Sequence, residues 1–419
     1  MSAGTRSHES IVSRIGHAGS TKAPRKLRRW WNELDPSFWR SELSFELPLS
    51  QRMQVALTAA GDLVTRTAAA TLLGATALPF GFSPARIRDL EAEGEAYARF
   101  LDEDPARTFR APEHGVRVTR TKARWPHFAP SGGSCEDLRF DSAYTPLVAA
   151  YAKGYLANAK NRVAHARHWF HGGGPRPTVI AIHGFTADLY ALNEWFFALP
   201  WLYELGCDVL LFTMPFHGQR SSTLAPFSGH GFFSGGIAGI NEAFLQAVHD
   251  FRVFMDHLMI VRGVETVGVT GVSLGGYTSA LLAAVEPRLA FSVPNVPLVS
   301  VADLALEWHP VSELIRAVMR IKGLPVQTLR RWLALTSPLS YTPLLPKERL
   351  MIIGGVADRL APPKHSRELW EHWDRCRIHW YCGSHLLHLD RGEYLREIAK
   401  FFGGISVLDK TKRRRKKRR

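Results

Sequence analysis

The residue best placed for chemistry in this sequence is Ser273, which stands between two glycines in the pattern G-x-S-x-G. Alternating valines before the pattern predict a buried strand, and an alanine- and leucine-rich run after it predicts a helix. A serine on a tight turn from a strand into a helix is held in a strained backbone conformation that exposes its hydroxyl. The helix N-terminus behind it favours developing negative charge. This context predicts that Ser273 is a nucleophile rather than part of an ordinary glycine-rich turn.

Two backbone N–H groups are placed to stabilise the negative charge that attack by this serine would produce. One belongs to Leu274, directly after the serine. The other belongs to Phe185, in a tight turn that follows the continuous apolar run from Thr178 to Ile182. Two N–H groups that point at one position form an oxyanion hole for acyl transfer.

An acid and a base follow the serine in the chain, each in a loop after a predicted strand. Asp358 comes after the strand predicted at 349–353, and His385 comes after the strand predicted at 377–381. Open α/β sheets bind their ligands beyond the carboxyl ends of the strands, so we expect the three side chains to meet there. His385 would take the proton from Ser273 and later activate water, while Asp358 would hold the imidazole tautomer and stabilise its charged form.

Other residues compete for these two roles. Asp303 and Glu307 follow an earlier predicted strand, and either could serve as the acid. Asp358 would then only cap the helix that follows it. His388, three residues after His385, is the alternative base.

Histidines are numerous, and some lie near the expected cleft. Four of them are candidates for substrate contact: His183, His217, His230 and His388. The pattern H-x-x-H at 385–388 has no partner Glu or Asp motif, so no metal site is indicated.

Taken in order and spacing, these segments resemble the α/β-hydrolase superfamily. The resemblance spans residues of about 145–404 and is carried by His183-Gly-Phe, Gly271-Val-Ser-Leu-Gly275, Gly355-Val-Ala-Asp-Arg359, Gly383-Ser-His385 and, after the second apolar strand, Pro215-Phe-His-Gly-Gln-Arg-Ser-Ser222. It implies a Ser–Asp–His hydrolase without a cofactor. In this family the base often follows a Gly-Gly or Gly-Ser pair, which favours His385 over His388. The chain is similar to a poorly characterised branch with a long N-terminal extension.

The order of predicted elements indicates an α/β fold, because strands alternate with helices from about residue 141 onward. With the resemblance, this predicts an α/β-hydrolase domain over 141–405, with a mostly parallel sheet flanked by helices. Residues 162–171 are predicted to form an exposed strand of it. A small helical cap is expected at about 297–345, and its amphipathic pattern fits ordinary core somewhat better than the wall of an apolar acyl pocket.

The region before this domain is predicted to be a mostly helical extension over 29–140. Helices are expected at roughly 50–78 and 84–103. Aromatic residues between 27 and 45 are expected to pack against the catalytic body, with contact to a membrane as the alternative. Residues 1–28 and 406–419 are predicted to be disordered.

The net charge of +15 is concentrated at the two ends of the 419 residues. Residues 409–419 contribute +8 and residues 1–30 contribute +6, which leaves about +1 for the body. With a neutral body and no aromatic residues within the tail, sequence-specific nucleic-acid binding is not expected. We predict that the tail contacts an anionic membrane surface or another polyanion, with a merely solvated tail as the alternative.

Several features point to the cytoplasm, with peripheral attachment to the inner face of the membrane as a variant of this prediction. Four scattered cysteines suggest reduced thiols. The N-terminus lacks the apolar core of a signal peptide. The apolar stretch from Thr67 to Phe82 is too short and too interrupted to span a bilayer.

The function predicted from the sequence is a serine hydrolase of the esterase or lipase type. It would cleave a small-molecule or lipid carboxylic ester through an acyl-enzyme on Ser273. The same triad also hydrolyses amides and thioesters, so these substrates remain open. The alternative from another class is a catalytically idle hydrolase fold that serves as a scaffold, although a scaffold has no physical need for an intact Ser, Asp and His.

Overall fold

The computed structural model describes residues 27–80, 84–113, 115–389 and 391–408. The predicted disorder of the N-terminus and of the basic tail concerns residues that lie almost entirely outside these ranges.

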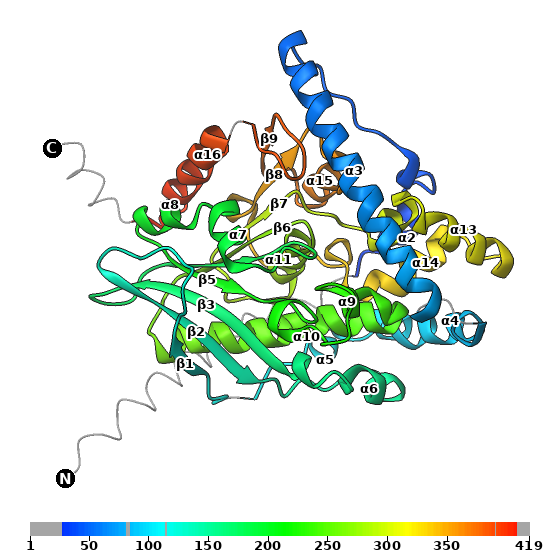
Figure 1. The fold of residues 1–419 in the computed structure, drawn as a ribbon, viewed down its shortest axis with the longest axis horizontal. Coiled ribbons are helices and arrows are strands. Elements are labelled where there is room, and N and C mark those ends of the chain that lie inside the picture. The colour runs from blue at the N-terminus through cyan, green and yellow to red at the C-terminus, as the bar shows by residue number, and fades with distance from the viewer. Residues whose placement is uncertain (1–26, 81–83, 114, 390, 409–419) are drawn as a thin grey trace.

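A nine-stranded sheet forms the centre of the described chain, in the order β1-β2-β3-β5-β4-β6-β7-β8-β9 (Figure 1). The six strands from β5 to β9 in that order run parallel, whereas β1, β2 and β3 join by antiparallel pairing. The strands are β1 (Thr119–Lys122), β2 (Gly133–Asp141), β3 (Val163–His171), β4 (Thr178–Ile182), β5 (Asp208–Phe212), β6 (Val267–Val272), β7 (Ser292–Asn295), β8 (Met351–Gly355) and β9 (Arg377–Tyr381).

Helices cover both faces of this sheet because its central strands are apolar on both sides. Val179 and Ala181 of β4 pack in a cluster with α8 and α16, whereas Ile180 and Ile182 pack in a second cluster with α10 and α11. The body helices are α6 (Ala149–Leu156), α7 (Tyr190–Phe196), α8 (Leu199–Glu204), α9 (His230–Ser234), α10 (Gly236–Asp256), α11 (Leu274–Val285), α15 (Pro363–His372) and α16 (Arg391–Gly404).

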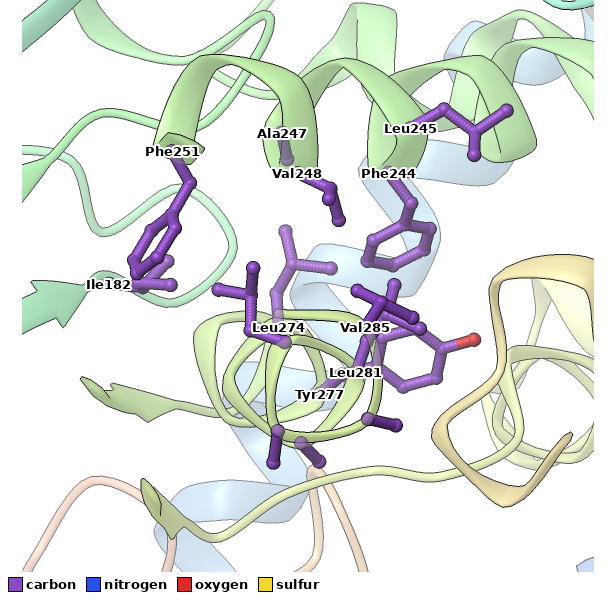
Figure 2. Close-up of a cluster of buried hydrophobic side chains, with 14 of the residues drawn as sticks. Ile182, Phe244, Leu245, Ala247, Val248, Phe251, Leu274, Tyr277, Leu281 and Val285 are labelled. Atoms are coloured by element: carbon purple, nitrogen blue, oxygen red, sulfur yellow. The ribbon is translucent and has the colours of Figure 1, made fainter. Parts of the chain in front are cut away.

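Helix α11, which follows the turn at Ser273, packs against the long helix α10. Figure 2 shows aromatic and aliphatic side chains of α10 directed toward those of α11, with Ile182 at the end of β4 beside them. The side chains drawn there include Phe244, Val248 and Phe251 of α10 and Leu274, Tyr277 and Leu281 of α11. This apolar contact fixes α11, and therefore the turn that precedes it, against the sheet.

The predicted cap is present as three helices, α12 (Val301–Glu307), α13 (Val311–Lys322) and α14 (Val326–Leu333). They pack against one another and against the N-terminal helices α2 (Trp30–Glu33), α3 (Leu49–Phe80) and α4 (Pro84–Ala98). The N-terminal region also contains the short helix α5 (Pro105–Thr108). The helices expected at 50–78 and 84–103 correspond to α3 and to α4 with the short turn that follows it.

The aromatic residues near the start of the described chain pack against the body, as predicted. Trp30 is buried and its indole Nε1 donates to Ser340 Oγ at 2.9 Å. Phe38 lies edge-on to His365, with ring centroids 5.3 Å apart.

Two predictions about the start of the sheet are wrong, namely a domain boundary and the exposure of a strand. The region 29–140 is mostly helical, as predicted, but it also supplies β1 and β2, and β2 pairs with β3 along nine residues. The predicted boundary at 140/141 therefore falls within a strand. The strand at 162–171 is not exposed either, because β3 lies between β2 and β5 and most of its side chains are buried.

Helix α3 lies along one side of the molecule, and its N-terminal end extends beyond the body (Figure 1). One face packs inward against α13 and α9 and buries Thr58, Asp62 and Ala70. The opposite face carries exposed apolar side chains, of which Leu49 at 77% and Leu57 at 75% are the most exposed. Within the described residues, no helix combines the length and the apolar character that a bilayer-spanning segment needs.

Candidate active site

The turn at Ser273 has the strained geometry that the sequence pattern predicts. Ser273 has a φ of 56° and stands between the end of β6 and the start of α11. A Cβ on Gly271 would lie 2.2 Å from the Gly275 carbonyl oxygen, and one on Gly275 would lie 2.0 Å from the Ile182 carbonyl oxygen. Because real Cβ contacts are never so short, only glycine fits at both positions. The two glycines of the pattern G-x-S-x-G are therefore required by the packing of the turn.

The two predicted oxyanion donors lie beside this serine. Leu274 is the first residue of α11, where backbone N–H groups have no partner within the helix. Phe185 lies in a turn closed by a hydrogen bond from the Ala187 N–H to the Gly184 carbonyl, at 3.1 Å. A Cβ on Gly184 would lie 3.6 Å from Ser273 Cβ, so the turn approaches the serine closely.

Asp358 and His385 form a buried hydrogen-bonded pair on the loops after β8 and β9. His385 Nδ1 donates to Asp358 Oδ2 at 2.6 Å. The other carboxylate oxygen, Oδ1, accepts the backbone N–H groups of Leu360 at 2.9 Å and Ala361 at 2.8 Å. With both oxygens held, Asp358 fixes the imidazole tautomer that carries its proton on Nδ1 and leaves Nε2 as a base.

This pair also sets the basicity of the imidazole. Burial alone would lower the pKa of His385, but the negative charge of Asp358, its hydrogen bond and the charge of Asp62 outweigh burial. The pKa of His385 is therefore raised above its ordinary value.

Ser273 and His385 do not form a hydrogen bond with each other in the structure. They lie at the carboxyl ends of β6 and β9, at the same edge of the parallel part of the sheet. Hydrogen bonds of catalytic groups are often long before substrate binds and shorten in the complex, so this geometry does not exclude the base.

The alternative acids and the alternative base have other partners. Asp303 is fully buried and forms a bidentate pair with Arg330, in which Nη2 lies 2.7 Å from Oδ1. Glu307 lies 3.0 Å from Lys364 Nζ. His388 packs against the ring of Tyr381, with centroids 4.2 Å apart, and burial lowers its pKa to about 3. Among these candidates, only Asp358 and His385 are brought together.

The structure gives other surroundings to three of the four histidines expected to contact substrate. His183 holds its own turn, because Nδ1 bonds to the Gly184 carbonyl at 2.8 Å and Nε2 accepts the Met214 N–H at 3.0 Å. His217 is fully buried and its Nδ1 bonds to the Pro215 carbonyl at 2.8 Å. Neither these two nor His388 lines the cavity beside Ser273, whereas His230, the fourth candidate, does.

That cavity has a volume of about 280 Å³ and is bordered by Ser273, Leu274 and Phe185. Its wall is mostly apolar and is built by the cap helices together with α3 and α4. The cap side chains in this wall include Leu304, Trp308, Ile315, Val318, Met319 and Leu329. The sequence pattern favoured ordinary core for the cap, but the structure directs its apolar face into this cavity.

The loop after β5, which carries part of the family resemblance, is fixed by a buried arginine. Arg220 Nη2 lies 2.7 Å from Asp250 Oδ2 and also donates to the Asn161 carbonyl at 2.9 Å. Both members of the ion pair are fully buried, so the loop is held rigidly at the edge of the sheet where Ser273 lies.

Sequence reasoning missed one residue that touches the Asp–His pair. Asp62 of α3 is 1% exposed, and its Oδ2 accepts the backbone N–H groups of His385 at 2.7 Å and Arg359 at 3.1 Å. The only signal in the sequence is a lone carboxylate in a largely apolar helical stretch. Among the described residues, no three or more His, Cys, Asp or Glu side chains form a cluster that could hold a metal ion.

Comparison with known proteins agrees with this fold. Residues 177–352 match the family model described as the alpha/beta hydrolase fold. An uncharacterised protein found in two strains of Mycobacterium tuberculosis is 31% identical over 260 residues, which is 59% of this chain and 58% of that protein. The dihydrolipoyllysine-residue acetyltransferase component of the acetoin cleaving system of Cupriavidus necator is 33% identical over 142 residues, or 34% of this chain and 31% of that protein.

Among solved structures, the acetyl xylan esterase from Paenibacillus sp. R4 is similar with a TM-score of 0.52 and 15% identity, covering 78% of this chain and 100% of that chain. The sheet order, the strained serine turn and the family match agree on an α/β-hydrolase fold, with the match confined to residues 177–352. The match spans less than two thirds of the length of the Mycobacterium tuberculosis relative, namely 58%.

Proposed function

We propose that the protein is a serine hydrolase that cleaves a carboxylic ester with an apolar acyl or alcohol part. The observation that carries the proposal is the position of Ser273. It stands on a strained turn at φ 56° and forms part of the wall of an apolar cavity. The hydrogen-bonded pair of Asp358 and His385 at the same sheet edge supports it.

In the proposed reaction, Ser273 Oγ attacks the ester carbonyl carbon while His385 Nε2 takes the hydroxyl proton. The carbonyl oxygen becomes an oxyanion that the N–H groups of Leu274 and Phe185 stabilise. When the intermediate collapses, His385 returns its proton to the leaving alcohol and an acyl-enzyme remains. Water, deprotonated by His385, then attacks the acyl group, the acid leaves and Ser273 regains its proton. Asp358 stabilises the imidazolium in both steps.

The apolar cavity gives more support than the fold does for an ester with an apolar acyl or alcohol part. Each Å² of apolar substrate surface buried in such a wall contributes roughly 25 cal/mol, so acyl chains long enough to reach the cap helices gain affinity. The likeness to the acetyl xylan esterase concerns the fold alone, since the two chains are only 15% identical. Amides and thioesters remain substrates that the same groups would accept.

Labelling with a fluorophosphonate tests this proposal. Because the probe reacts only with an activated serine, we expect one adduct, located at Ser273 by mass spectrometry, and none in Ser273→Ala. A panel of p-nitrophenyl esters from acetyl to lauroyl should then show that turnover favours acyl chains longer than acetyl. If the folded protein takes up no label, the hydrolase proposal fails and the scaffold alternative takes its place.

We also propose that the basic tail attaches the protein to an anionic surface, which fits a cytoplasmic protein at the inner face of a membrane. Residues 409–419 lie outside the described residues and carry a charge of +8. Each basic residue near an anionic bilayer contributes about 1 kcal/mol, and this attraction weakens with salt. The full chain should co-sediment with phosphatidylserine vesicles at low salt, and a chain that ends at residue 408 should not. Equal sedimentation of both would contradict the proposal.

A further inference from the structure

The base loop and the acid loop of the candidate site are joined to each other through one carboxylate oxygen of the N-terminal region. Asp62 Oδ2 accepts the N–H of His385 at 2.7 Å and the N–H of Arg359, the residue after Asp358, at 3.1 Å. Asp62 belongs to α3, which lies outside the matched hydrolase region of 177–352. A side chain from the extension therefore contacts the backbone of the proposed base itself.

A second side chain of α3 strengthens this attachment. Arg66 lies one helical turn after Asp62, on the same face, and its Nη1 donates to the Arg359 carbonyl at 2.9 Å. The N–H and the C=O of Arg359 are thus both bonded to α3. Because Arg359 follows Asp358 directly, this double contact fixes the peptide next to the acid.

The state of Asp62 indicates a role beyond helix packing. It is 1% exposed, and its second oxygen, Oδ1, is buried without a hydrogen-bond partner. An apolar residue would pack α3 against the body without the cost of burying a partly satisfied carboxylate. A carboxylate does what an apolar residue cannot, because it accepts two N–H groups from two loops and adds negative charge near the imidazole.

Other ionisable groups face this charge and the imidazole. Asp358 and Asp62 both favour the protonated form of His385, and burial together with the charge of His385 lowers the pKa of His388 on the same loop. Arg66 of α3 interacts electrostatically with the charged groups of Asp62, Asp358, Arg359 and Glu307, the last of which belongs to α12. The two carboxylates next to His385 thus have Arg66 as a balancing positive charge from the same helix.

We propose that Asp62 is a positioning residue of the active site, through which helix α3 fastens the Asp358 and His385 loops in one arrangement. The N-terminal extension is then a working part of the hydrolase rather than an appendage. The catalytic consequence rests on the proposed function, whereas the anchoring of the loops does not.

Two substitutions separate the hydrogen bonds of Asp62 from its charge. Asp62→Ala removes both acceptors, so the loops shift and kcat for a short ester should fall on the order of 10- to 100-fold, with little change in KM, because misplacement of catalytic groups by about 1 Å has effects of this size. Asp62→Asn keeps an acceptor oxygen and loses the charge. It should retain most of kcat, while the acid limb of kcat/KM moves to lower pH, because a negative charge that favoured the imidazolium is gone.

Thr58→Ala is the matched control. Thr58 is buried on the same face of α3, one turn before Asp62, and its hydroxyl bonds only within the helix. If Asp62 merely docks α3, both alanine variants will behave alike and Asp62→Asn will leave the pH profile unmoved, which would overturn the proposal. Should Asp62→Ala fail to fold, the pH profile of Asp62→Asn decides the matter.

Hydrogen–deuterium exchange of residues 383–389 gives a readout that needs no activity. Exchange there should rise in Asp62→Ala and stay at the wild-type rate in Thr58→Ala. Unchanged exchange in Asp62→Ala would contradict the anchoring. A wild-type protein that takes up no fluorophosphonate, yet shows this exchange difference, would remove the proposed hydrolase function and leave the anchoring role of Asp62 intact.

Discussion

Ser273→Ala is expected to lower kcat for the best ester by on the order of 10⁵- to 10⁶-fold, the effect that loss of a nucleophile has in serine hydrolases. The proposed oxyanion donors and the cavity should stay in place in this variant, since Leu274 and Phe185 would act through backbone N–H groups. The residual rate should therefore exceed that of the ester in water by about 10³-fold, and KM should change little. Alanine at this position keeps the positive φ that the turn imposes, so the fold is expected to persist.

Ser279→Ala is the control for this experiment. Ser279 is buried in α11, and its hydroxyl donates to the Gly275 carbonyl at 2.8 Å. The variant therefore tests the removal of a hydroxyl near the turn without changing the proposed nucleophile. Steady-state kinetics and circular dichroism of both variants give the comparison. Equal activity in Ser273→Ala and wild type would mean that the acyl-enzyme mechanism is wrong.

The parts of the fold that could be predicted from sequence are those with local signals. Strands β4 and β9 have the predicted bounds because each is a short apolar or aromatic run followed by a turn. The serine turn needs two glycines within five residues, because a Cβ at either position would collide with a backbone carbonyl oxygen. Asp358 and His385 could be named because each follows a strand, and parallel strands end at the same edge.

The parts that could not be predicted depend on distant partners. Strand β3 was predicted to be exposed, yet its Arg167 is buried against Asp137 of β2 at 2.7 Å. His168 likewise lies 3.6 Å from Glu136 of the same strand. The polar residues of β3 find their charged partners on β2, and a sequence does not show which strands will be neighbours.

Asp62 is the extreme case of this limitation, since it contacts the backbone of a residue 323 positions later in the chain. The cap poses a related difficulty. Its helices have the same amphipathic pattern whether they close over solid core or over a cavity, because both bury one apolar face. Only the arrangement of α3, α4 and the cap around Ser273 reveals the cavity.

Asp358→Asn is expected to lower kcat on the order of 10⁴-fold, because it leaves His385 in the wrong tautomer. The two N–H groups of Leu360 and Ala361 require an acceptor, so the amide oxygen will take the place of Oδ1. The amide NH₂ then faces His385 Nδ1 and donates to it. The imidazole must carry its proton on Nε2, where the base is needed, and it cannot accept the proton of Ser273.

The pH dependence and one control complete this prediction. In the wild type, kcat/KM should rise as pH passes through the pKa of His385, which lies above its ordinary value because Asp358 and Asp62 favour the imidazolium. The loss of the Asp358 charge should move this acid limb to lower pH. Asp303→Asn, which removes the alternative acid, is the control. Asp303 forms a buried ion pair with Arg330 that stabilises the fold and takes no part in the proposed reaction. This variant should therefore have a lower Tm and an unchanged kcat per folded molecule. A large loss of kcat in Asp303→Asn, with Asp358→Asn fully active, would transfer the role of the acid to Asp303.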